Sequence, residues 1–227
     1  AIIRGDTSKK QIAIVFTGDE FADGGHEIAN ILKSNKTKAS FFFTGRFYNN
    51  PAFTTIVKKL KNDGHYLGAH SDEHLLYCDW TKRDSLLLTE QEFKKDLLEN
   101  YKKMAAFGIS KKQAGYFLPP YEWYNDTIAA WTKQLGFELI NYSPGTLSHT
   151  DYTTPDAKNY RNSATIYQSI IDYEKKSSNG LNGAILLMHI GTDPKRTDKL
   201  YHLLPQLLQW LSEKKYNLVK VSRLLKQ

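Results

Sequence analysis

The 227-residue sequence contains one cysteine, Cys78. An internal disulfide therefore cannot form within it, and a catalytic thiol is not expected. No stretch approaches the roughly 18 or more uninterrupted apolar residues of a membrane-spanning helix. Internal repeats, low-complexity tracts and Pro- or Ser-rich linkers are also absent. These absences argue against a disulfide scaffold, a helical membrane protein and a disordered chain, and they predict a single domain over residues 1–227.

Basic residues outnumber acidic ones, with 31 Lys and Arg against 24 Asp and Glu, which gives a net charge of +7. The lysines occur as scattered pairs, and no nucleic-acid motif accompanies them. We therefore interpret this charge as a solvated surface, with no nucleic-acid partner. The sequence starts at Ala1 without a leader, as it would after removal of a signal peptide. The oligomeric state is left open.

Short apolar runs alternate with segments of helical periodicity, which is typical of βαβ units and a parallel sheet. The expected strands lie at residues 11–17, 39–44, 66–69, 115–118, 137–142, 183–189 and 217–221. Seven strands with helices outside predict an α/β fold, a distorted (β/α)7-type barrel. The longest irregular stretch, residues 144–161, is rich in Ser, Thr, Asp, Asn and Pro. We expect it to border the mouth of the barrel and to shape substrate access.

Three histidines stand in settings that suggest a metal enzyme. His70 and His74 are four residues apart, which on a helical turn would place their Cβ atoms about 5–6 Å apart, suitable for one shared ion. Asp19 follows an apolar run that ends in Gly18, and it is the best carboxylate to complete the set. Such an ion activates water and polarises a carbonyl. His189, after a later apolar run, could protonate a leaving group. The pattern predicts hydrolysis of an amide or ester.

Five short motifs, in order, make the chain resemble the polysaccharide deacetylases of carbohydrate esterase family 4, the NodB homology domain. Residues 70–74 (His-Ser-Asp-Glu-His) match the family's His-(Ser/Thr)-x-x-His, and residues 117–121 (Phe-Leu-Pro-Pro-Tyr) match its Phe-Arg-Pro-Pro-Tyr. Residues 187–189 (Leu-Met-His) match its Leu-x-His. Residues 16–20 (Phe-Thr-Gly-Asp-Glu) stand where the family has Thr-Phe-Asp-Asp, and residues 39–45 resemble its second strand. The resemblance covers nearly the whole chain.

This resemblance implies a divalent-metal-dependent hydrolase that removes acetyl groups from N- or O-acetylated carbohydrate. The metal would be zinc, with cobalt or nickel as alternatives. Asp19, His70 and His74 would bind it, and His189 would be the general acid. The backbone N–H of Tyr121 would help to hold the oxyanion of the transition state.

The resemblance also implies substrate contacts, with an acetylated poly- or oligosaccharide as the partner. From such a substrate we expect a secreted or cell-envelope (periplasmic) location. Leu187 would line a small pocket for the acetyl methyl group. Trp80 and Trp123 follow the motifs at residues 70–74 and 117–121, and they are candidates to form the floor of a glycan-binding groove. Trp131 and Trp210 fall within amphipathic segments, and we expect them to pack in the core.

Two departures from the family pattern leave the general base unassigned. The family has two adjacent acidic residues in its first motif and an arginine that pairs with the earlier one. With Asp19 as metal ligand, the base position is Gly18, and the arginine is replaced by Leu118. A shift of one residue would instead make Asp19 the base and Glu20 the ligand, although the first alignment needs fewer deletions. Glu122 and Glu20 are the candidates for a replacement base.

The acidic partner that orients the acid histidine in the family should lie near residues 141–143, where no Asp or Glu occurs. The other histidines, His26, His65, His149 and His202, are expected to be ordinary. Three functions therefore stay open. The chain is a metal-dependent carbohydrate deacetylase, a catalytically impaired domain that binds metal and glycan without turnover, or an amidohydrolase for a small amide outside the sugars.

Overall fold

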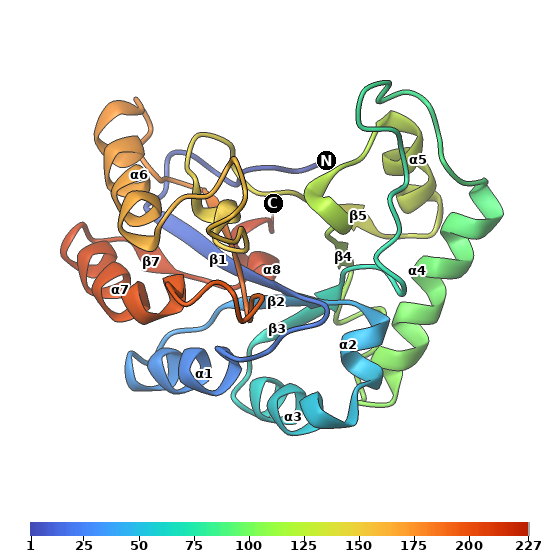
Figure 1. The fold of residues 1–227 in the computed structure, drawn as a ribbon, viewed down its shortest axis with the longest axis horizontal. Helices are drawn as coiled ribbons and strands as arrows, with labels where there is room; N and C mark the ends of the chain where they lie inside the picture. Colours follow the sequence, from blue (N-terminus) through green and yellow to red (C-terminus); the bar gives the residue numbers. More distant parts are fainter. Residues whose placement is uncertain (227) are drawn as a thin grey trace.

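Seven parallel strands form the centre of the molecule and helices surround them in the computed structural model, which describes residues 1–226 (Figure 1). The strand order is β5-β4-β3-β2-β1-β6, with β7 also pairing with β1. This arrangement confirms the predicted α/β barrel. The strands are β1 (Gln11–Gly18), β2 (Ser40–Phe43), β3 (Tyr66–Ala69), β4 (Tyr116–Phe117), β5 (Glu138–Leu139), β6 (Ile185–His189) and β7 (Asn217–Leu218).

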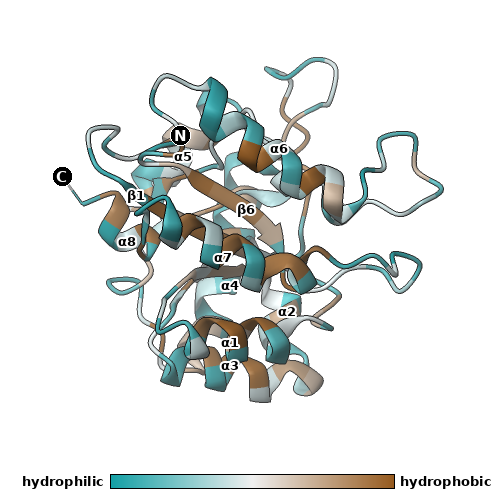
Figure 2. Cartoon of the chain, turned by 90° about the vertical axis from the view of Figure 1, so that its left-hand side faces the viewer, coloured by the Kyte–Doolittle hydropathy of each residue, from teal (hydrophilic) through white to brown (hydrophobic). Residues whose placement is uncertain are grey.

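The helices are amphipathic and turn their apolar sides to the strands. In Figure 2, α1, α6 and α7 carry hydrophobic and hydrophilic residues on different sides, whereas β6 is hydrophobic up to its end at His189. Helix α4 begins with a capping box in which Thr89 and Glu92 satisfy each other's backbone N–H groups. The helices are α1 (Gly25–Ser34), α2 (Gly45–Asn49), α3 (Thr54–Asn62), α4 (Glu90–Ala105), α5 (Asp126–Gln134), α6 (Ser163–Lys176), α7 (Leu204–Glu213) and α8 (Val221–Leu224). Short 3-10 turns are η1 (Pro51–Phe53), η2 (Pro120–Glu122), η3 (Ser148–Thr150) and η4 (Leu200–Leu203).

Strand β1 divides its side chains between two apolar layers, because successive residues of a strand point to opposite faces. Ile12, Ile14 and Phe16 belong to the outer cluster between the strands and the helices. Ala13 and Val15 belong to a smaller inner cluster inside the barrel. Burial on both faces explains why this strand is apolar without alternation.

The N-terminal segment closes the gap between β5 and β6. The N–H of Ile2 donates to the carbonyl of Leu139 at 2.9 Å, and the N–H of Asn141 donates back to Ile2 at 3.0 Å. Farther along, the N–H of Gly5 donates to the carbonyl of Gly183 at 2.8 Å. β5 and β6 are not paired with each other, and residues 2–5 supply hydrogen bonds to the segments next to both of them.

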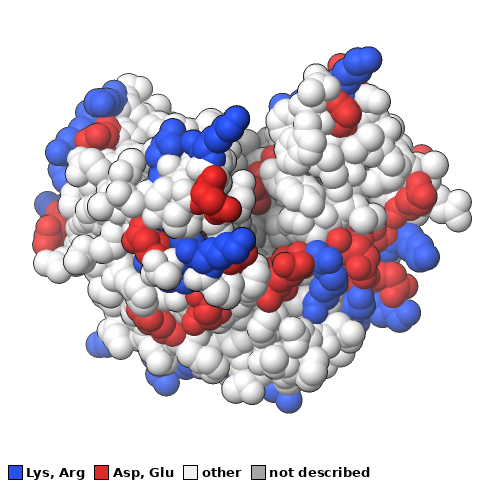
Figure 3. All heavy atoms as spheres, viewed as in Figure 1, with Lys and Arg blue, Asp and Glu red and all other residues white. Residues whose placement is uncertain are grey.

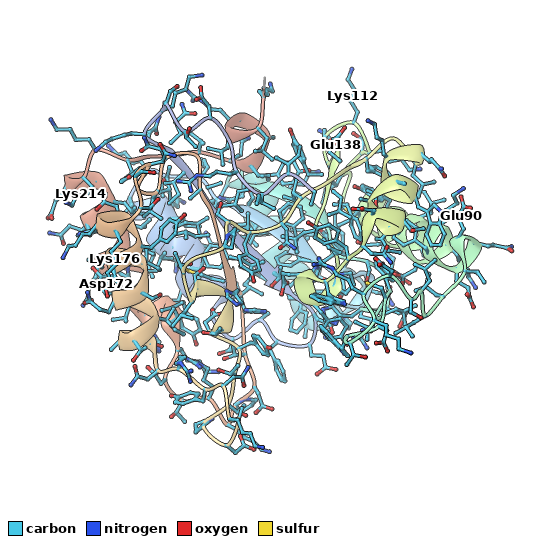
Figure 4. The ribbon with its side chains drawn as sticks, turned by 90° about the horizontal axis from the view of Figure 1, so that it is seen from above. Glu90, Lys112, Glu138, Asp172, Lys176 and Lys214 are labelled. Carbon is cyan, nitrogen blue, oxygen red and sulfur yellow. The ribbon has the colours of Figure 1, made fainter. Side chains whose placement is uncertain are left out.

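Charged side chains project from the outer surface. In the view from above, the six labelled charged residues lie at the periphery, among them Lys176 and Lys214 from two of the scattered lysine pairs (Figure 4). Within residues 1–226, no helix combines the length and the apolar character needed to cross a membrane.

We predict that Arg4→Ala lowers the free energy of unfolding by about 2 kcal/mol, because a charged donor with several partners is lost. Its guanidinium donates to the carbonyls of Asn182 at 2.8 Å and Gly180 at 2.7 Å, and to the hydroxyl of Tyr173 at 2.9 Å. Chemical denaturation measures the change. The control is Lys9→Ala, at an exposed ion pair, which should change stability by less than about 0.5 kcal/mol. Equal effects of the two substitutions would contradict a closing role for Arg4.

Candidate active site

A cleft of about 830 Å³ opens where the strands end at their carboxyl termini. Every residue predicted for the site except Leu187 lines this cleft. Figure 3 shows this side of the molecule hollowed between two lobes, with charged side chains on both of them. The carboxyl ends of barrel strands are the place where such folds hold their chemistry.

His70 and His74 lie in an irregular turn after β3, so the helical turn expected for them is wrong. Ser71 and His74 have positive φ angles of 72° and 54°, which bend the chain back on itself. The two imidazole rings are nevertheless only 5.1 Å apart between centroids. The Nδ1 of His70 lies 2.8 Å from the carbonyl oxygen of Leu118. Because a carbonyl only accepts, this contact puts the proton on Nδ1 and leaves Nε2 free to bind a ligand.

Both imidazoles are kept neutral. Burial lowers the pKa of His74 to about 4, with Asp19 opposing the shift and Arg46 adding to it. Burial also holds the pKa of His70 well below its usual range, and the neighbouring His74 acts in the same direction. A neutral imidazole is the form that coordinates a metal ion.

Asp19 is engaged by other side chains. Arg46 donates from Nε to Oδ1 at 3.1 Å and from Nη2 to Oδ2, and Thr44 Oγ1 donates to Oδ1 at 2.7 Å. Within residues 1–226, no group of three or more His, Cys, Asp or Glu side chains is arranged to hold a metal ion. The two neutral imidazoles, 5.1 Å apart, suit a divalent ion, but the structure does not supply a complete set of three protein ligands. Asp19 as a metal ligand stays a prediction.

The first motif places no carboxylate on the inner face of β1. The alternation along the strand turns Thr17 toward the cleft, where its buried hydroxyl has no hydrogen-bond partner among residues 1–226. A Cβ atom at Gly18 would lie 2.7 Å from Ile190 and 2.9 Å from Phe43, so this position faces the outer layer and has no room for a side chain. Leu118 is fully buried in the inner cluster. With Asp19 aligned as the metal ligand, the family's base position is Gly18, which has no side chain, and its arginine position is Leu118. The side chain that β1 turns inward here is the hydroxyl of Thr17.

The acid candidate His189 has a carboxylate partner, Asp151, that sequence analysis missed. The Nδ1 of His189 lies 2.6 Å from Asp151 Oδ1, and its backbone N–H donates to Oδ2 at 3.0 Å. Burial disfavours the charged imidazole, but the charge and hydrogen bond of Asp151 outweigh it and raise the pKa of His189. Asp151 comes from the irregular stretch 144–161, and no sequence signal separates it from Asp156 in the same loop.

A buried arginine fastens this loop. Arg196 is inaccessible to solvent and donates to the carbonyls of Thr153 at 2.7 Å, Arg161 at 3.0 Å and Asp198 at 2.8 Å. These acceptors lie on both sides of the cleft-facing part of the loop and on the segment after β6. Arg196 therefore holds the Asp151 loop against the strand that carries His189.

Glu122 faces the same cleft from a strained turn. Tyr121 and Glu122 both have positive φ angles, 58° and 54°, in a region that non-glycine residues seldom adopt. The Glu122 carbonyl accepts a hydrogen bond from Asn141 Nδ2 at 2.7 Å, which helps to hold the turn. Burial raises the pKa of the Glu122 carboxyl to about 7, with His189 opposing and Asp151 adding to the shift. Strain of this kind is retained where the surrounding structure requires it, often at functional sites.

Exposed aromatic rings stand on both walls of the cleft. On one wall, Trp80 is 54% exposed, and its ring lies 5.4 Å from that of Tyr121 and 5.5 Å from that of Trp123. On the other wall, Tyr152 is 49% exposed and lies 5.1 Å from the ring of His189. Rings of this kind stack on the apolar faces of sugars.

Two residues lie elsewhere than expected. Leu187 is fully buried in the inner cluster, beneath the cleft rather than on its surface, so the structure does not bring it to the predicted methyl pocket. His149, expected to be ordinary, lines the cleft and stacks on Tyr142 at 4.4 Å. Trp131 and Trp210 pack against the outer core cluster, as expected.

The fold and the cleft together define a parallel α/β barrel whose strand ends carry a histidine–carboxylate pair, two neutral imidazoles and a carboxyl of raised pKa. Such a set is suited to hydrolytic acid–base chemistry. A family model described as polysaccharide deacetylase matches residues 4–140, and the chain belongs to this family. The resemblance noted from its motifs is thereby confirmed.

Relatives agree with this assignment. A peptidoglycan-N-acetylglucosamine deacetylase from Bacillus cereus is 25% identical over 220 residues, which cover 96% of this chain and 90% of the relative. The solved structure of a peptidoglycan N-acetylglucosamine deacetylase superposes with a TM-score of 0.78 at 19% identity, covering 99% of this chain and 92% of the other. A pseudoenzyme of carbohydrate esterase family 4 from Bacillus anthracis gives a TM-score of 0.74 at 20% identity, covering 99% of this chain and 68% of the other. The two structures support the fold.

We predict that Asp151→Asn lowers the pKa of His189, because the substitution removes the negative charge that stabilises the imidazolium. NMR titration of the His189 ring measures the change. Asp156→Asn, on an exposed part of the same loop, is the matched control and should leave the His189 titration unaltered. A His189 titration that is the same in wild type and Asp151→Asn would show that the pair does not tune this histidine.

Proposed function

We propose that this protein removes acetyl groups from N- or O-acetylated carbohydrate chains with the help of a divalent ion. The observation that carries the proposal is the convergence of the His189–Asp151 pair, Glu122 and the two neutral imidazoles in one cleft. Membership of the polysaccharide deacetylase family supports it. The imidazoles of His70 and His74 would hold the ion, zinc or else cobalt or nickel, which when bound would polarise the acetyl carbonyl.

The protein's own groups would move the protons. Glu122, with a pKa of about 7, would accept a proton as water forms its bond to the acetyl carbon. His189, kept in its charged form by Asp151, would give a proton to the departing amine or alkoxide as the bond from the acetyl carbon breaks. The products are acetate and the deacetylated sugar. The backbone N–H of Tyr121 would donate to the carbonyl oxygen as negative charge develops there.

The aromatic walls support a chain-like sugar as the substrate. Trp80, with Trp123 behind it, would stack on one sugar unit, and Tyr152 would contact another from across the cleft. The printed name of the Bacillus cereus relative, a peptidoglycan-N-acetylglucosamine deacetylase, agrees with a polymer that contains N-acetylglucosamine. A secreted or cell-envelope location would follow from such a substrate.

A second function has a specific observation in its favour. Gly18 and Leu118 leave the cleft without the acidic residue and the arginine that the family pattern contains, and Asp19 is held by Arg46. A domain with these changes could bind metal and glycan without turnover. Deacetylation is the better supported function, because Glu122 provides a carboxyl of suitable pKa in the same cleft.

The deciding experiment is the release of acetate from N-acetylglucosamine oligomers and acetylated xylan. The protein is first stripped with a chelator and then reloaded with zinc, cobalt or nickel. We expect release that disappears on chelation and returns with metal. A small aryl acetamide in the same panel tests the amidohydrolase reading. Glycan binding without acetate release, with the ion demonstrably bound, would replace the proposal by the binding function.

We predict that Glu122→Gln lowers kcat/KM for acetate release by about 10²–10⁴-fold, the range attributed to one general base. In wild type, kcat/KM should rise as the pH increases through about 7, because Glu122 must lose its proton to act. That rise should be missing from the residual activity of Glu122→Gln. Glu20→Gln, at an exposed position on the rim, is the matched control and should retain the wild-type profile. A reversal of these two results would assign the base to Glu20.

Unfolding measurements test the environment of Glu122 without relying on turnover. The folded protein keeps the proton up to about pH 7, whereas the unfolded chain loses it near the usual value of 4.5. Stability therefore falls between these values and levels off above them. Glu122→Gln removes this loss and should be more stable than wild type at pH 8 by about 1–3 kcal/mol. A stability difference that does not vary with pH would contradict the raised pKa.

A further inference from the structure

We propose that Arg46 withholds Asp19 from an ion at His70 and His74, so that the Arg46–Asp19 pair limits the metal affinity of the cleft. The inference rests on the proposed function only in taking the two imidazoles as the pair that holds the ion. The two imidazole rings lie 5.1 Å apart between centroids, and no third protein ligand joins them among residues 1–226.

The contacts of Asp19 leave it little freedom. Its Oδ1 accepts from Thr44 Oγ1 at 2.7 Å and from Arg46 Nε at 3.1 Å, while Oδ2 accepts from Arg46 Nη2. A fork of two parallel donors is the strongest common way to hold a carboxylate. The Asp19 side chain is only 20% exposed, so water competes weakly for its oxygens.

The backbone fixes Arg46 in this place. Its N–H donates to the carbonyl of Asp72, inside the turn that carries the two imidazoles, at 3.2 Å. The N–H of Gly45 donates to Ser71 in the same turn at 2.9 Å, and the N–H of Thr44 donates to Gly18 at the end of β1 at 3.1 Å. The first turn of α2 is therefore tied to both segments that would have to cooperate in binding an ion. These bonds fix the backbone of Arg46 at the place from which its guanidinium reaches Asp19.

Lys103, a lysine beside the turn that carries the two imidazoles, already has carboxylate partners. Lys103 Nζ lies 2.8 Å from Asp72 Oδ1, and it lies 3.9 Å from Glu73 Oε1. Arg46 has Asp19 as its ion-pair partner. An incoming divalent ion would need to take that carboxylate from a permanent cation and then remain close to it. Both demands weaken binding, the first through competition and the second through repulsion between like charges.

The opposite role for Arg46 is a real alternative with an opposite consequence. An arginine that orients a ligating carboxylate strengthens metal binding, as hydrogen-bonded supports of metal ligands commonly do. Substitution of Arg46 would then lower the affinity. The direction of the change therefore decides between withholding and support.

The test measures zinc affinity of the metal-free protein by competition with a chromophoric chelator, so it needs no turnover. We expect Arg46→Gln to bind zinc about tenfold more tightly than wild type, or better. Arg46→Lys, which keeps the charge but loses the fork, should show a smaller gain. The matched control is Arg83→Gln, at a rim arginine that stacks on Trp123 and should leave the affinity unchanged. Unfolding curves check that each variant is folded.

Two further variants assign the cause. In the Arg46→Gln background, Asp19→Asn should abolish the gain, because the released carboxylate is then absent. His70→Ala should weaken zinc binding in every background. Affinity that is unchanged or weaker in Arg46→Gln, while His70→Ala still weakens binding, would overturn this inference alone. Equal affinity in His70→Ala and wild type would show that the imidazoles do not hold the ion, and the metal part of the proposed function would fall with the inference.

Discussion

The parallel pairing of β1 with its neighbours determines which side chains enter the cleft. Its register sets Thr17 opposite His189 on β6, and it sets Gly18 opposite Phe43 on β2. Because the side-chain period of a strand is two, a slip of one residue would exchange the inner and outer layers. The hydroxyl would then leave the barrel, and position 18, which has no room for a side chain, would face inward. The apolar residues before this point, on both faces of the strand, fix the register and thereby the chemistry beyond it.

Three carboxyl groups around the cleft differ in their partners, and the partners separate their roles. Asp151 is paired with the imidazole of His189 and raises the pKa of that ring. Asp19 is paired with the guanidinium of Arg46. Glu122 is half-buried and forms no ion pair among residues 1–226, and its pKa is raised to about 7. Environments that separate the behaviour of similar groups are how one cleft accommodates both an acid and a base.

Sequence reasoning located the strands because each lies in an apolar run, although several strands are shorter than the runs that predicted them. The run at residues 11–17 became β1 (Gln11–Gly18), whereas the run at 137–142 shortened to β5 (Glu138–Leu139) because its last residues pair with the N-terminal segment. The motif residues converged on one cleft, since strand ends in a parallel barrel share an edge. Leu187, which was predicted to line a methyl pocket, is instead buried in the inner cluster beneath the cleft.

The residues that sequence reasoning missed act across long separations. Asp151 reaches His189 from 38 residues earlier along the chain, out of an irregular loop without periodicity. Arg46 reaches Asp19 across 27 residues, from a helix of one turn. Positive φ angles at Ser71 and His74 replaced the expected helical turn with a tighter one. None of these features leaves a local pattern, because each depends on how distant segments come together.

The buried guanidinium of Arg196 has a consequence for how a substrate enters. Its bonds to Thr153, Arg161 and Asp198 order the wall that carries Tyr152 as part of folding itself. The conformational entropy of that loop is therefore lost during folding, so ordering the loop does not lower the affinity for a ligand. A ligand would therefore bind against a wall that is already ordered. Selection among ligands would then depend on their fit to a fixed shape rather than on closure of a flap.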